Sequence, residues 1–170
     1  MTKLNSYLSL IRFYNPIGFW LLLWPGLWGL FLSDNFNIQN FTIVVLGSFL
    51  TRSLGCAIND FLDKDFDKSV ERTKNRPIAS KELSLSEAGI FIILLASFCI
   101  FLLMQTNPYT IKLVSYFAIP MIILYPLMKR FLAMPQLFLG ATFGLSLPIS
   151  YSIAESTLSL EVIFLYIGCI

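Results

Sequence analysis

The chain has 170 residues, of which 56% are hydrophobic and only 13% are charged. An average soluble domain carries about 25% charged residues, so this composition predicts a membrane protein and excludes a disordered chain. The net charge of +2 is too small for a nucleic-acid-binding surface, so we expect no nucleic acid partner. Histidine is absent, which excludes serine–histidine–aspartate catalysis and histidine-bound zinc within this chain.

Five apolar runs are long enough to cross a membrane. A hydrocarbon core about 30 Å thick requires roughly 20 helical residues. The runs cover residues 13–32, 40–59, 88–104, 111–128 and 131–154, and a sixth run begins after Ser159. We therefore expect an all-α fold, a polytopic transmembrane helical bundle that forms one membrane domain over residues 1–170. Because the sixth run is only half a span, the sequence indicates a fragment or a naturally shortened protein.

Local patterns predict how these helices begin, bend and pack. Ser84 and Glu87 have the spacing of a capping box at the start of the third run. Prolines within the first and fourth runs predict kinks, at Pro25, Pro120 and Pro126. Small residues spaced four apart predict close helix packing, at Gly47, Thr51 and Gly55 in the second run and at Gly140 and Gly144 in the fifth.

The basic residues predict the orientation in the membrane. With the amino terminus in the cytoplasm, 10 of the 12 Lys and Arg residues fall on the cytoplasmic side, as the positive-inside rule requires. Lys112 falls outside, and Arg52 lies within a span and has no assigned role. We expect an integral protein of the bacterial inner membrane, or of the mitochondrial inner membrane if the protein is eukaryotic.

An acidic cluster follows the second run. If the helix continues, Asn59, Asp63 and Asp67 lie four residues apart on one face, and Asp60 joins them. Like charges on one face repel, so the cluster belongs at the cytoplasmic helix end and should bind a cation. Carboxylate and amide oxygens suit Mg²⁺, which commonly takes one or two carboxylates, waters and substrate phosphates. The pattern therefore predicts a Mg²⁺-diphosphate site.

Basic residues that suit phosphate follow the acidic cluster. Arginine forks pair with phosphate oxygens, and lysine adds a point charge. The candidates are Arg72, Lys74 and Arg76 beside the cluster and Lys129 and Arg130 at the cytoplasmic end of the fourth run. Two readings compete with a binding site. In one, the charges only anchor a helix end; in the other, they form the gate of a transporter or membrane scaffold.

The segment GCAINDFLDKDFDKSVERTKNRP resembles the first aspartate-rich motif, NDxxDxxxD followed by an R-T-x-x-R-P loop, of the UbiA intramembrane prenyltransferases. Three further segments resemble the same family: PIGFWLLLWPGLWGL, YPLMKR and MPQLFLGATFGLSLPIS. Within the family, the resemblance is greatest to members that transfer a polyprenyl group to 4-hydroxybenzoate in ubiquinone biosynthesis. An enzyme with another acceptor, or an inactive truncated remnant, remains an alternative.

The resemblance implies nine transmembrane helices around a cavity in which Mg²⁺ bridges two aspartate motifs and the diphosphate of a polyprenyl donor. It makes Asn59, Asp63 and Asp67 metal ligands, with Asp63 and Asp67 catalytic. It places Asp60, Arg72, Lys74 and Arg76 near the diphosphate, and Lys129 and a catalytic Arg130 near the acceptor carboxylate. No second aspartate motif follows Asp67, so the chain carries about half of the expected site.

Overall fold

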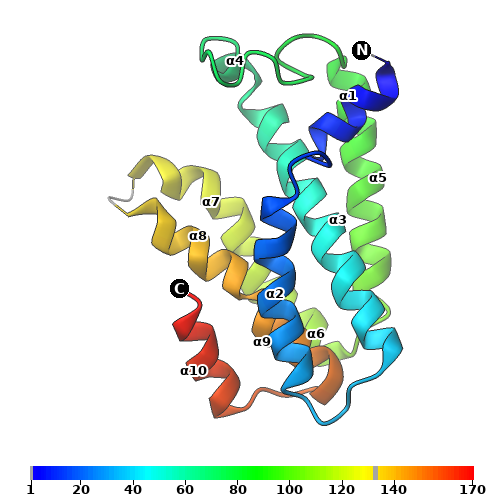
Figure 1. Cartoon of the computed structure of the whole chain (residues 1–170), viewed down its shortest axis with the longest axis vertical. Coiled ribbons are helices and arrows are strands. Elements are labelled where there is room, and N and C mark those ends of the chain that lie inside the picture. The colour runs from blue at the N-terminus through cyan, green and yellow to red at the C-terminus, as the bar shows by residue number, and fades with distance from the viewer. Residues whose placement is uncertain (1, 132–133) are drawn as a thin grey trace. The chain divides into compact units, whose positions relative to one another are not determined.

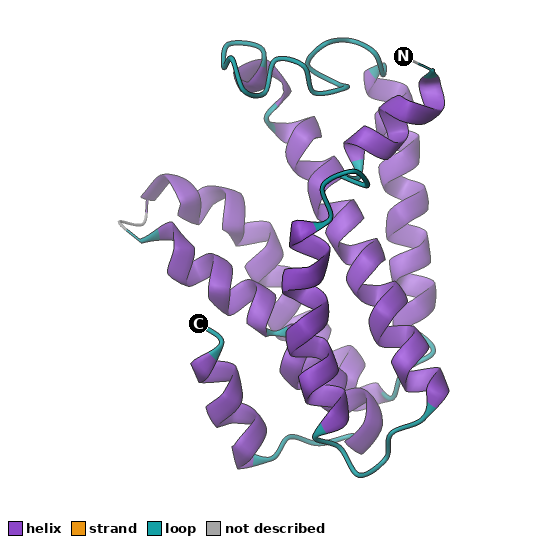
Figure 2. Cartoon of the chain, in the orientation of Figure 1, coloured by secondary structure: helices purple, strands orange, loops and turns teal. Residues whose placement is uncertain are grey.

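The computed structural model describes residues 2–131 and 134–170, without the side chains of residues 126–131 and 135. All secondary structure in these ranges is helical, as predicted (Figures 1 and 2). The helices are α1 (Lys3–Leu10), α2 (Ile17–Phe31), α3 (Ile38–Leu62), α4 (Lys64–Asp67), α5 (Leu85–Leu103), α6 (Pro108–Leu113), the π-helix η1 (Val114–Ala118), α7 (Ile119–Phe131), α8 (Pro135–Gly144), α9 (Ser146–Glu155) and α10 (Leu160–Gly168).

Four helical segments in the described part of the chain are long and apolar enough to cross a membrane: Ile38–Leu62, Leu85–Leu103, Pro108–Tyr125 and Gln136–Glu155. They correspond to the second, third, fourth and fifth predicted runs. The first predicted run forms the shorter apolar helix α2, which has 15 residues and begins at Ile17 instead of residue 13. It begins later because α1 ends in a turn at Arg12 and Pro16 directly precedes α2, where proline suits a helix start.

The chain divides into two compact units, each built from two separate stretches of sequence. Unit 1 comprises Met1–Gly18 and Leu50–Ile100, and unit 2 comprises Phe19–Phe49 and Phe101–Ile170. This division into compact units does not test the expectation of a single membrane domain over residues 1–170, which stays a prediction.

Unit 1 combines α1, the second half of α3, α4 and α5. Its buried core consists of Leu10, Ala57, Ile78, Leu83, Ala88 and Leu95. The predicted capping box is confirmed, since the Ser84 N–H donates to the Glu87 carboxylate at 2.9 Å and the Glu87 N–H donates to Ser84 Oγ at 3.2 Å. Helix α1 lies beside the start of α5, where Lys3 pairs with Glu87 and the rings of Tyr7 and Phe91 lie 4.9 Å apart (Figure 1). These contacts bring the amino-terminal segment next to the loop that follows the acidic cluster.

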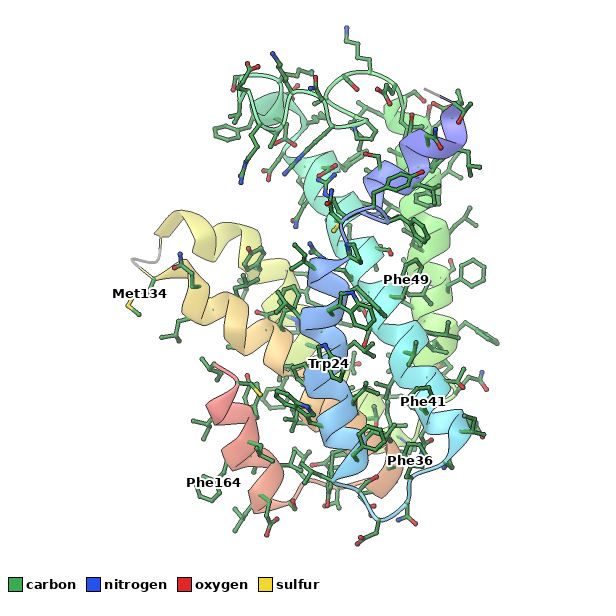
Figure 3. All side chains as sticks on the ribbon, in the orientation of Figure 1. Trp24, Phe36, Phe41, Phe49, Met134 and Phe164 are labelled. Carbon is green, nitrogen blue, oxygen red and sulfur yellow. The ribbon has the colours of Figure 1, made fainter. Side chains whose placement is uncertain are left out.

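Unit 2 packs α2 and the first half of α3 with the helices after residue 100. Leu23, Leu30 and Val44 form its buried core, and the aromatic side chains of Phe36 and Phe41 lie together near the connection between α2 and α3 (Figure 3). Gly29 contacts α9 so closely that a Cβ there would overlap the Leu147 carbonyl. The buried Thr110 and Ser152 hydroxyls are hydrogen-bonded at 2.8 Å.

The small-residue pattern of α8 is confirmed as a packing surface. A Cβ at Gly144 would lie 3.2 Å from the Cys169 Cβ, and a Cβ at Gly140 would lie 2.9 Å from the Ile170 carbonyl oxygen. The stripe on α3 is confirmed only in part. Gly47 faces Leu102, but among the described residues a Cβ at Gly55 would meet no atom within 4 Å outside its own stretch of helix.

Two interruptions break the α-helical pattern of the later spans. The π-helix η1 precedes Pro120, and a local π adjustment is one way in which a membrane helix tolerates a proline. A turn at Leu145 separates α8 from α9 within the fifth predicted run. Helix α2 continues through Pro25, which lies inside it. Pro126 lies in α7, with its side chain outside the described residues.

Candidate functional site

The acidic cluster lies where α3 ends, in unit 1. Helix α3 stops at Leu62, Asp63 adopts φ −90° and ψ 6°, and the short helix α4 follows. The predicted continuous helix is therefore interrupted at Asp63. The four-residue backbone spacing survives the interruption, because the Asp63 N–H donates to the Asn59 carbonyl at 2.9 Å and the Asp67 N–H donates to the Asp63 carbonyl at 2.8 Å. Asn59 and Asp63 are half-buried.

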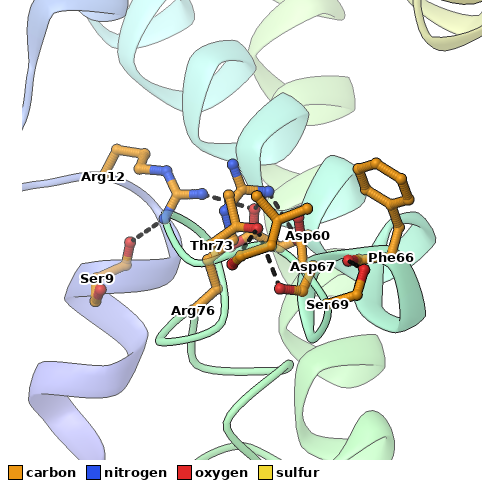
Figure 4. A network of polar contacts seen from close by, with 9 residues as sticks. Ser9, Arg12, Asp60, Phe66, Asp67, Ser69, Thr73 and Arg76 are labelled. Atoms are coloured by element: carbon orange, nitrogen blue, oxygen red, sulfur yellow. Dashed lines mark hydrogen bonds and ion pairs between the residues drawn. The ribbon is translucent and has the colours of Figure 1, made fainter.

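Asp60 lies almost completely inside unit 1, with 1% of its surface exposed. Its Oδ1 accepts a hydrogen bond from Arg12 Nη2 at 2.7 Å and lies 3.2 Å from Arg76 Nη1 (Figure 4). Its Oδ2 is buried and has no hydrogen-bond partner in the described part of the chain. One oxygen of Asp60 therefore faces two guanidinium groups, while the other has unused acceptor capacity.

Asp67 is also buried, with 3% of its surface exposed, and it shares a cation with Asp60. The same Arg76 Nη1 donates to Asp67 Oδ2 at 2.8 Å (Figure 4). The Thr73 hydroxyl donates to the Asp67 backbone carbonyl at 3.1 Å and so holds the intervening loop against α4. Of the basic residues predicted near the cluster, Arg76 therefore contacts both buried carboxylates.

Arg12 was missed as a site residue by the sequence analysis. It follows α1 with a positive φ of 59°, in a turn where the Arg12 N–H donates to the Ser9 carbonyl and the Phe13 N–H donates to the Leu8 carbonyl. These two bonds form a Schellman-type helix end, a position that usually favours glycine. A non-glycine residue in this conformation costs of order 1–3 kcal/mol and persists only where surrounding contacts hold it. One such contact is the hydrogen bond from Arg12 to Asp60.

The remaining predicted residues differ in position. Arg72 and Lys74 are exposed, and Lys74 Nζ pairs with Glu71 at 2.6 Å. The side chains of Lys129 and Arg130 lie outside the described residues, although both belong to α7. The Arg52 guanidinium lies against Gly18 at the start of α2, where a Cβ on Gly18 would overlap it.

The donor atoms of the cluster are hard oxygens of the kind that Mg²⁺ prefers. Among the described residues, no group of three or more His, Cys, Asp or Glu side chains is arranged to hold a metal ion. Mg²⁺ commonly binds one or two carboxylates and takes its other ligands from water and substrate phosphates. The cluster therefore fits Mg²⁺ as a partial donor set that phosphate oxygens would complete.

The described chain is thus an integral membrane protein of apolar helices, with a buried centre of two carboxylates and two guanidinium groups at one end of a span. Comparison with known proteins identifies its family. The chain belongs to the UbiA prenyltransferase family, whose model matches residues 22–170.

Several curated relatives are named 4-hydroxybenzoate octaprenyltransferase. The protein of Polynucleobacter asymbioticus is 42% identical over 98% of this chain and 58% of its own length, and that of Polynucleobacter necessarius is 45% identical over 96% and 57%. The protein of Vibrio atlanticus is 40% identical over 98% and 59%. The chain therefore spans less than three fifths of these relatives.

Solved structures confirm the fold. A structure described as digeranylgeranylglyceryl phosphate synthase superposes with a TM-score of 0.81 at 24% identity, covering 99% of this chain and 59% of the other. A UbiA homologue from Archaeoglobus fulgidus bound to GPP and Mg²⁺ superposes with a TM-score of 0.75 at 19% identity, covering 96% and 58%. The all-helical fold predicted from the sequence is that of intramembrane prenyltransferases.

Proposed function

We propose that this chain is part of an enzyme that transfers a polyprenyl group from polyprenyl diphosphate to 4-hydroxybenzoate, ortho to the hydroxyl, in ubiquinone biosynthesis. The observation that carries the proposal is the meeting of Asp60, Asp67 and Arg76 at the end of an apolar helix, within the segment that resembles the family's aspartate motif. The names of relatives at 40–45% identity support 4-hydroxybenzoate as the acceptor.

In this proposal, Asn59, Asp63 and Asp67 supply oxygen ligands for Mg²⁺. The bound metal ion would supply a positive charge that stabilises the departing diphosphate. Arg72, Lys74 and Arg76 bind the same diphosphate, and the arginines can pair with its oxygens in a bidentate manner. Lys129 and Arg130 orient the acceptor carboxylate, a role that rests on the family resemblance alone. The second half of the site belongs to the part of the relatives that this chain does not span.

The reaction is an electrophilic aromatic substitution. Basic side chains stabilise the charge that develops on diphosphate as its bond to the allylic carbon breaks. The electron-rich ring of 4-hydroxybenzoate then attacks the allylic cation, and a carboxylate or the released diphosphate accepts the ring proton. The apolar helices exclude water, which would otherwise capture the cation.

We further propose that the acidic motif faces the cytoplasm of a bacterial cell. The distribution of Lys and Arg favours this orientation, and the relatives named above are bacterial proteins. The acceptor and the diphosphate group would then enter from the aqueous side, and the polyprenyl chain from the bilayer.

The test is prenyl transfer by the full open reading frame that contains this chain, expressed in a strain that lacks 4-hydroxybenzoate prenyltransferase. Membranes supplied with polyprenyl diphosphate and 4-hydroxybenzoate should form the prenylated acid when Mg²⁺ is present and should stop when it is chelated. Transfer to a different aromatic acceptor, and not to 4-hydroxybenzoate, would show that the proposed acceptor is wrong while prenyl transfer stands. Absence of any transfer from a folded protein would overturn the enzyme proposal in favour of a scaffold or transporter.

A further inference from the structure

Arg76 is placed as a bridge between two buried carboxylates. A single nitrogen, Nη1, lies 3.2 Å from Asp60 Oδ1 and 2.8 Å from Asp67 Oδ2. Arg12 adds a second guanidinium at Asp60, 2.7 Å from Oδ1. The two ionised carboxylates and two guanidinium groups together carry no net charge, so the centre is neutral without a metal ion.

A neutral centre disfavours a divalent cation that arrives alone. Binding such an ion beside Asp67, even with the half-buried Asp63 as a further ligand, would leave a net positive charge in a region where Asp60 and Asp67 are at most 3% exposed. Interactions between charges are stronger there than in water, because the surrounding medium screens them poorly. A diphosphate that arrives with the metal ion supplies compensating negative charge. The centre is therefore suited to a metal–diphosphate pair and poorly suited to either charge by itself.

We propose that Arg76 is an internal cation that pairs with Asp67 until a metal ion and diphosphate bind together. This pairing makes the binding of the metal ion depend on diphosphate, and the binding of diphosphate depend on the metal ion. The inference rests on the proposed function and assigns Arg76 a task beyond contacting diphosphate. When Asp67 ligates the metal ion, Arg76 leaves that carboxylate and turns its free N–H groups to diphosphate.

Asp60 is the fixed anchor of this exchange. It is 1% exposed, and Arg12 holds it independently of Asp67. Its Oδ2, which has no hydrogen-bond partner in the described residues, can accept a hydrogen bond from Arg76 once Asp67 is released. A guanidinium group has five N–H donors, so Arg76 stays anchored on Asp60 while its remaining N–H groups become accessible to diphosphate or to a labelling reagent.

Arginine modification of the unmutated complete protein tests the exchange directly. Arg76 is labelled with phenylglyoxal and quantified by mass spectrometry after no addition, Mn²⁺ alone, or Mn²⁺ with inorganic diphosphate. Saturating Mn²⁺ alone should increase Arg76 labelling about threefold or more, because Asp67 is taken over by the metal ion, and added diphosphate should suppress it. Arg72 is the internal control, since it is exposed and its labelling should not respond to Mn²⁺ alone. If the extent of Arg76 labelling does not change with saturating Mn²⁺, the inference is overturned.

Two variants of the complete protein test the energetic consequence. Arg76→Gln should tighten Mn²⁺ binding without diphosphate by about tenfold and weaken binding of inorganic diphosphate by a similar factor, as expected when a unit charge is removed at short range. Lys68→Gln removes the same charge from the same loop, where Lys68 pairs with the exposed Asp65, and should change neither affinity more than about twofold. Weaker or unchanged Mn²⁺ binding in a folded Arg76→Gln variant contradicts the proposal.

The outcomes separate this inference from the proposed function. If the unmutated protein transfers prenyl groups while Arg76 labelling ignores Mn²⁺, the exchange is wrong and the function stands. If a folded protein neither transfers a prenyl group nor binds diphosphate, both fail. The labelling experiment needs no substitution, so it remains decisive even if Arg76→Gln does not fold.

Discussion

Replacing Asp60 with asparagine removes the charge of the buried anchor while keeping its shape. The carboxylate is 1% exposed, and its Oδ1 faces Arg12 at 2.7 Å and Arg76 at 3.2 Å. A hydrogen bond to a charged group is worth about 1.5–3 kcal/mol, against about 0.5–1.5 kcal/mol for a neutral one. Weakening two such contacts, and leaving two arginines that retain partial access to water, should lower the free energy of unfolding by about 2–3 kcal/mol.

The assay is SDS-induced unfolding of the complete protein in mixed micelles, followed by tryptophan fluorescence. Asp65→Asn is the matched control, because Asp65 lies in the same motif but is exposed and pairs only with Lys68 in the part of the chain described here. Solvent-exposed pairs of this kind often contribute nothing measurable, so the control should unfold like the unmutated protein. A loss below about 1 kcal/mol for Asp60→Asn would refute the reasoning that Asp60 carries two charge-assisted contacts.

Two further substitutions test the helix contacts that hold each unit together. Gly29→Ala should destabilise the protein by about 1–3 kcal/mol, because a Cβ there overlaps the Leu147 carbonyl. A Cβ at Gly89 would meet no described atom within 4 Å outside its own stretch of helix, so Gly89→Ala should be neutral or stabilising in the same unfolding assay. Equal behaviour of the two glycine variants would contradict the packing described for α2 and α9. Ser84→Ala should lower stability by about 1 kcal/mol through loss of the helix cap, and Ser86→Ala, which leaves the cap bonds to Glu87 in place, should cost less. An equal loss for both serine variants would show that the cap contributes little.

Local patterns predicted the features whose physical causes are local. The capping box at Ser84 and Glu87 and the packing glycines of α8 depend on spacing within one helix, and both are confirmed. The family assignment is also confirmed. It could be made from the sequence because the motif from Asn59 to Pro77 is a contiguous segment whose residues and spacing are visible without a structure.

Other features depend on contacts between distant residues, and the sequence analysis missed them. Arg12 is 48 residues from Asp60, so no periodicity connects the two. The interruption of the helix at Asp63 was not predicted either, since the four-residue spacing fits a continuous helix equally well. The sequence does contain a signal for Arg12. It is a charged residue that directly precedes the first apolar run and lies four residues before Pro16, at the edge of a predicted membrane span. The lack of close packing at Gly55 within the described part of the chain was missed, because a small residue predicts close packing only when another helix approaches it.

The central claim is that oxygen atoms at the end of α3 bind the metal–diphosphate group. The most direct measurement compares Mg²⁺-dependent prenyl transfer to 4-hydroxybenzoate by Asp63→Ala and Asp65→Ala in the complete protein, with both variants shown to be folded. The account predicts that Asp63→Ala abolishes transfer and that Asp65→Ala, which alters an exposed side chain of the same motif, retains it. Transfer that survives Asp63→Ala would contradict the account.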